Sequence, residues 1–130
     1  MKYENLEKAI LGATPIRHVR MLYEGAIDSL ERALEIMKNH SEDTEDLQRK
    51  LENLEKAMDI IAALELTLNE RDGGDIAKQL HQIYVAIGND LGDIIIKNRN
   101  DVVTVEKAIK VLKELKEAWE EVEREVVKGG

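Results

Sequence analysis

Apolar side chains recur every three or four positions in four stretches of the chain, a spacing that places them on one face of an α-helix. The first stretch follows Thr14-Pro15, and Thr at an N-cap followed by Pro in the first turn is a common start of a helix. The polar run of residues 39–46 ends it. Its predicted buried face consists of Ile16, Val19, Tyr23, Ala26, Ile27, Leu30, Ala33, Leu34 and Met37.

The second stretch begins near Thr44 and is predicted to end at Arg71-Asp72-Gly73-Gly74, where two glycines release the chain from helical dihedral angles. The third begins at Asp75, whose carboxylate suits the positive end of a helix. The predicted buried residues of the second helix are Leu47, Leu51, Leu54, Met58, Ile61 and Leu68. Those of the third are Ile76, Leu80, Ile83, Tyr84, Ile87, Leu91 and Ile94.

The fourth stretch follows the polar break at residues 98–101. Its predicted buried residues are Val105, Ala108, Ile109, Leu112, Leu115, Trp119, Val122 and Val126. Four helices with short connections predict an all-α, antiparallel up-down-up-down four-helix bundle that forms one domain over residues 1–130, with the helices in residues 14–128. In residues 1–13, Tyr3, Leu6 and Ile10 share a helical face. This segment is too short to be stable alone, so we expect it to pack on the bundle.

Composition and charge narrow the possible partners. The 130 residues include 19 Lys and Arg against 27 Asp and Glu, a net charge of −8, which disfavours nucleic acid and anionic lipid. There is no cysteine, which excludes disulfides and thiolate metal sites. No apolar run is long enough to span a membrane, and the N-terminus lacks the apolar core of a signal peptide, so the expected location is the cytoplasm, without membrane insertion.

The sequence offers little for catalysis. A di-metal site in a helical bundle uses Glu and Glu-x-x-His pairs that face inward, yet His18, His40 and His81 have no Glu three residues before them. Glu65 lies in line with Leu51 and Met58 on the second helix, where a single carboxylate is expected to pair or to reach solvent. We therefore predict no catalytic, cofactor-binding or metal-binding residue.

The third helix carries a second row, His81, Val85, Gly88, Gly92 and Ile96, roughly opposite its predicted core stripe. Each glycine costs about 1 kcal/mol relative to Ala in a helix interior, but the missing Cβ lets another backbone approach closely. On the second helix Ile60, Leu64 and Leu66 widen the apolar surface. Together these residues predict a groove for a partner helix. The same pattern fits scattered surface residues, cover by the fourth helix, or a homodimer interface.

Several motifs resemble those of the flagellin-specific export chaperones, the FliS family. Ala13-Thr14-Pro15 and Met21-Leu22-Tyr23-Glu24-Gly25-Ala26-Ile27 resemble the family's ATP start and MLYDGAI motif. Asp59-Ile60-Ile61, with Leu64 and Leu68, resembles DIIxxLxxxL, and residues 73–84 resemble GGEIAxNLxxLY. Leu112, Leu115, Ala118 and Trp119 resemble the closing LxxLxxAW. Glu24, Asp75 and Gln79 depart from the usual residues but keep their chemical class.

This resemblance implies a cytoplasmic chaperone that binds the disordered C-terminal segment of flagellin, blocks premature polymerisation and supports delivery to the flagellar type III export machinery. It also implies that the N-terminal segment, with Tyr3, Leu6 and Ile10, plugs the chaperone's own groove until flagellin displaces it. A generic homodimeric bundle and a metal-dependent bundle enzyme are the alternative classes.

Overall fold

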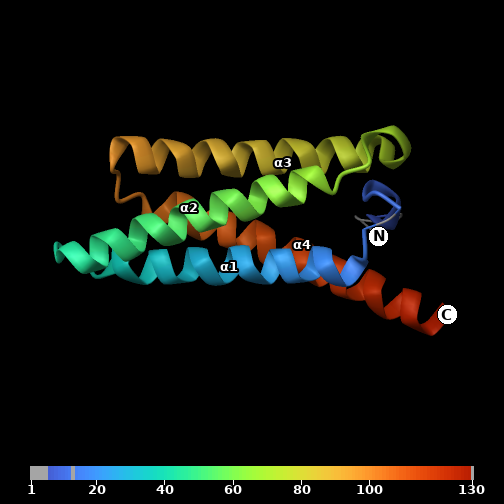
Figure 1. The fold of residues 1–130 in the computed structure, drawn as a ribbon, viewed down its shortest axis with the longest axis horizontal. Helices are drawn as coiled ribbons and strands as arrows, with labels where there is room; N and C mark the ends of the chain where they lie inside the picture. Colours follow the sequence, from blue (N-terminus) through green and yellow to red (C-terminus); the bar gives the residue numbers. More distant parts are fainter. Residues whose placement is uncertain (1–5, 13, 130) are drawn as a thin grey trace.

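The computed structural model describes residues 6–12 and 14–129. A short 3-10 helix, η1 (Leu6–Ala9), precedes four long helices. These are α1 (Ile16–Lys38), α2 (Thr44–Leu66), α3 (Glu70–Lys97) and α4 (Val102–Gly129). Successive helices run in opposite directions along the long axis of the molecule (Figure 1), so the predicted all-α antiparallel four-helix bundle is confirmed.

Local chemistry explains most helix ends. The Asp43 carboxylate caps α2 by accepting hydrogen bonds from the backbone N–H groups of Glu45 and Asp46, which satisfies donors that have no partner within the helix. Asn98 ends α3 in the left-handed conformation, with φ of 49° and ψ of 47°. The start of α1 differs from the prediction, because Pro15 itself is the N-cap and makes no side-chain capping bond. Thr14 instead precedes the cap.

The boundary between α2 and α3 also differs from the prediction. Helix α2 ends at Leu66, and residues 67–69 connect it to α3, which already begins at Glu70. Asn69 starts α3 by accepting a side-chain hydrogen bond from the Asp72 N–H. The glycines therefore lie inside the first turns of α3, where Gly74 takes φ of 54° and ψ of −136° and kinks the helix. The actual break is at residues 67–69, because their backbone forms hydrogen bonds with the backbone of residues 9–11.

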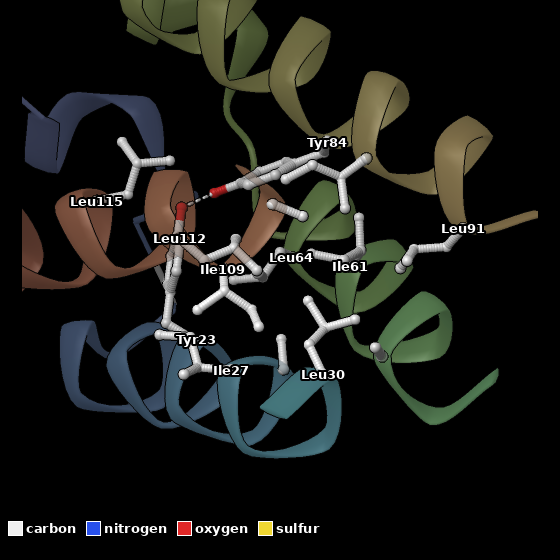
Figure 2. Packing of buried hydrophobic residues seen from close by; sticks show 14 of the residues in the cluster. Tyr23, Ile27, Leu30, Ile61, Leu64, Tyr84, Leu91, Ile109, Leu112 and Leu115 are labelled. Carbon is white, nitrogen blue, oxygen red and sulfur yellow. Dashed lines mark hydrogen bonds between the residues drawn. The ribbon is translucent and has the colours of Figure 1, made fainter. Parts of the chain in front are cut away.

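The core fills the space between all four helices and η1. Figure 2 shows Tyr23 of α1 and Tyr84 of α3 meeting through their hydroxyl groups in the middle of this packing. The two rings lie 6.3 Å apart at 57°, a tilted arrangement favoured by aromatic pairs. Burial raises the pKa of the Tyr84 hydroxyl, so that hydroxyl stays protonated, and its hydrogen bond with Tyr23 joins α1 and α3.

Helix α3 has an unequal set of neighbours. It packs along α2 and against η1, but touches α4 sparsely, whereas α1 packs extensively on both α2 and α4. The loop after α3 is tied to the end of α1, where the Asn100 amide donates to the Met37 carbonyl at 3.0 Å. Helix α3 therefore depends mainly on α2 and η1 for its packing.

Candidate partner-binding surface

The predicted second row of α3 lies on the surface. Val85 is 38% exposed and Ile96 is 85% exposed. A Cβ placed on Gly88 would meet no atom within 4 Å, so the helix surface there is open. His81 is also exposed. The row thus combines apolar side chains at its ends with bare backbone in its middle.

Two contacts show that this row faces the α2 side of α3. A Cβ on Gly92 would lie 3.5 Å from the Met58 methyl carbon of α2. Further along, the His81 imidazole Nδ1 lies 2.9 Å from the Glu65 carboxylate of α2. The row is therefore not opposite the core, as the helical wheel suggested, but beside the line where α2 and α3 meet.

The structure places the three predicted groove residues of α2 in different surroundings. Leu64 is fully buried in the core. The methyl end of Ile60 lies 3.2 Å from where a Cβ on Gly25 would be, so it packs on α1. Leu66 is 80% exposed, but it lies at the last turn of α2. Leu64 therefore cannot line the groove as predicted, Ile60 faces α1, and the part of exposed Leu66 in the groove stays a prediction.

Leu47 and Leu51, which were predicted to be buried, lie on the surface of α2 instead. They are 38% and 40% exposed. Their spacing of eleven and seven residues from Met58 puts them on the same face of α2. We call this surface the α2/α3 seam; it consists of Leu47, Leu51 and Met58 with Val85, Gly88, Gly92 and Ile96.

A signal for the true α2 face was present in the sequence. Glu65 falls in the same line as Leu51 and Met58, and a carboxylate is almost never fully buried without a partner. That line should therefore have been assigned to a surface-facing side of α2. In the structure Glu65 contacts His81, which also lies 3.5 Å from Glu70. These groups form the polar end of the seam.

The N-terminal residues are placed at a different spot. We call residues 6–12 the N-terminal strap. Leu6 and Ile10 are buried, as is Ala9 between them. The strap lies at the end of the bundle beside the start of α3 (Figure 1), and η1 contacts α3 and α4. The expectation that this segment packs on the bundle is met for Leu6 and Ile10, while Tyr3 lies outside the described residues.

Among the described residues, no group of three or more His, Asp or Glu side chains is close enough to hold a metal ion. In the same part of the chain, no helix is long and apolar enough to cross a membrane. An ion pair from Arg20 of α1 to Glu123 of α4 at 2.6 Å lowers the pKa of the Glu123 carboxyl and joins the two helices.

Comparisons with known proteins agree with the motifs. The family described as "Flagellar protein FliS" matches residues 1–126. The flagellar secretion chaperone FliS of Vibrio cholerae serotype O1 is 32% identical over 121 residues, which cover 93% of this chain and 84% of that protein. The flagellar secretion chaperone FliS of Salmonella typhimurium is 30% identical over 125 residues, which cover 91% and 83%. That of Escherichia coli is 28% identical over 117 residues, which cover 89% and 81%. The chain therefore belongs to the FliS family.

Proposed function

We propose that this protein is a cytoplasmic export chaperone that binds the disordered C-terminal segment of flagellin. By holding that segment it keeps flagellin from polymerising early and supports delivery to the flagellar type III export machinery. The activity is binding and not catalysis. Membership of the FliS family supports the substrate class, and the open α2/α3 seam supports the mode of binding.

The observation that carries the binding mode is the glycine floor of the seam. Gly88 and Gly92 lower the middle of the α3 surface between Val85 and Ile96. Because they cost helix stability, their position next to exposed apolar side chains is explained best by the close approach of another chain. A helix with its own apolar stripe fits such a surface.

Binding would be coupled to folding of the partner. A disordered segment loses conformational entropy when it forms a helix, and burial of its apolar face on the seam offsets that loss. The depth of approach at Gly88 is then critical, because a side chain added there would hold the incoming helix away from Val85 and Ile96.

Gly88→Leu tests this arrangement. The added side chain enters open space, so the bundle should stay folded, while the dissociation constant for a flagellin C-terminal peptide should rise at least about tenfold, or roughly 1.4 kcal/mol. Isothermal titration calorimetry measures the affinity, and circular dichroism checks the fold. Lys110→Leu is the matched control, since it adds the same side chain at an exposed position of α4. Equal affinities for both variants would contradict binding at the seam.

A homodimer that uses the seam is the main competing possibility. Size-exclusion chromatography with light scattering, with and without the flagellin peptide, separates the two. A monomer that forms a one-to-one complex supports the chaperone. A stable dimer that Gly88→Leu dissociates, and that ignores the peptide, supports the homodimer instead.

We further propose that the N-terminal segment, with Tyr3, Leu6 and Ile10, competes with the partner, which must then reach beyond the seam to the end of the bundle where the strap lies (Figure 1). Ile10→Asp should loosen the buried strap and raise the apparent affinity or the association rate for the peptide. Leu11→Asp is the control, because Leu11 is adjacent but exposed. If neither quantity changes in Ile10→Asp, the segment does not compete.

A further inference from the structure

The N-terminal strap is joined to the α2–α3 connection by backbone hydrogen bonds. The Leu11 N–H donates to the Thr67 carbonyl at 2.8 Å, and the Asn69 N–H donates to the Ala9 carbonyl at 2.8 Å. Ile10 and Leu68 form an antiparallel bridge between these bonds. Since the bonds use main-chain atoms, they do not depend on the side chains of the strap.

The same strap rests on the first turn of α3 at Gly73. A Cβ on Gly73 would lie 2.8 Å from the Ala9 Cα and 3.1 Å from the Lys8 carbonyl oxygen. Both are main-chain atoms, so rotation of a side chain cannot relieve the overlap. A Cβ there would also lie 2.7 Å from the Ala77 methyl group. Gly73 is therefore required by contact, and its φ is not in the left-handed range.

Gly74, next to Gly73, is required for its backbone conformation and not for a contact. Its φ of 54° is in the range that side chains disfavour, yet a Cβ there would meet no atom within 4 Å. Gly74 redirects the chain after the first turn of α3, while Gly73 leaves space for the strap. The two adjacent glycines thus act through separate physical causes.

We infer that Gly73 is the latch position for the N-terminal strap: its missing Cβ allows residues 8 and 9 to close on α3 and form the bridge to residues 67–69. Because η1 of the strap contacts both α3 and α4, which touch each other only sparsely, closing the latch also completes the core around Leu6, Ala9 and Ile10. This inference concerns the fold of the chain itself and holds whichever partner binds the seam.

Amide hydrogen exchange on the full-length chain tests the latch. In Gly73→Ala the Leu11 and Asn69 amides should exchange at least about tenfold faster than in the wild type, because the hydrogen bonds across the bridge open more often. Amides in the middle of α1, such as that of Leu30, should keep their rates. Gly88→Ala is the matched control in the same helix and should leave Leu11 and Asn69 unchanged.

A second variant separates the strap contact from the contact within α3. Gly73→Ala combined with Ala77→Gly removes the overlap with the Ala77 methyl group but keeps the overlap with Ala9. Fast exchange at Leu11 and Asn69 in this double variant supports the latch. Wild-type exchange in either Gly73→Ala or the double variant would overturn it, and so would a global loss of protection in both, since the glycine would then serve the helix and not the strap.

Limited proteolysis gives an independent reading. Trypsin cuts after Lys8, whose carbonyl lies against Gly73, so a closed strap resists cleavage there. The double variant should be cut at Lys8 at least about tenfold faster than the wild type, at equal protease concentration. Equal rates of cleavage would contradict the latch.

Discussion

Two glycines of α3, Gly73 and Gly88, lie in opposite surroundings. At Gly73 a Cβ would overlap the main chain of Ala9 at 2.8 Å, whereas at Gly88 it would meet nothing within 4 Å. The first site is closed by a segment of the same chain. The second is open and is flanked by exposed Val85 and Ile96.

The comparison shows two reasons to keep a glycine in a helix although it lowers the stability of the helix relative to alanine. At Gly73 the contact that requires it is already made within the molecule. At Gly88 no contact within the described residues requires it, which is why we assign that requirement to a partner.

The largest expected difference is between two isoleucines. Ile10 of the strap is 6% exposed and Ile96 of the seam is 85% exposed. Ile10→Ala should lower the free energy of unfolding by about 2–4 kcal/mol, because it leaves a cavity, while Ile96→Ala should change it by less than about 0.5 kcal/mol. Urea unfolding followed through the single tryptophan, Trp119, measures both. If Ile10→Ala has no effect, the strap is not part of the folded core.

The next largest effect is a gain in stability. Gly88→Ala should raise the free energy of unfolding by roughly 0.5–1 kcal/mol, since Ala favours a helix and the position is open. Thermal and urea unfolding give the value, and the wild type is the reference. A loss of stability would show that the seam is already filled at Gly88, and the comparison with Gly73 would fail.

The smallest effect concerns charge at the closed end. Arg20 and Glu123 join α1 and α4 through a partly exposed pair, and the pKa of Glu123 lies below its ordinary value of 4.5. A lowered pKa means that the pair stabilises the fold above pH 4.5 and that this stabilisation disappears as the pH falls through the lowered value.

Glu123→Gln should therefore reduce stability slightly at pH 7, less than Ile10→Ala does, and the difference from the wild type should vanish in acid. Urea unfolding at several pH values between 7 and 3 measures it. A loss at pH 7 as large as that of Ile10→Ala would mean that charge, and not packing, holds the closed end together.

Helix α2 shows where reading the sequence failed. Its apolar residues cover much more than one face, so periodicity alone allowed two orientations. Periodicity predicted that Leu47 and Leu51 are buried and that Leu64 lines the groove, whereas the structure buries Leu64 and leaves the other two partly exposed. The orientation is set by neighbours, with Ile60 over Gly25 of α1 and Met58 beside Gly92 of α3. Neither contact can be read from α2 by itself.

By itself the sequence determined the helices, their number and antiparallel order, most of the core of α1, α3 and α4, and the family. Those properties follow from local spacing and from motifs read along the chain. Only the tertiary structure decided which side of α2 faces the core, where the strap docks and what each glycine of α3 does. These depend on distances between residues far apart in sequence, such as Ala9 and Gly73, which helical periodicity does not encode. The glycines of α3 were visible as a pattern from the start, but their roles became distinct only once their neighbours were known.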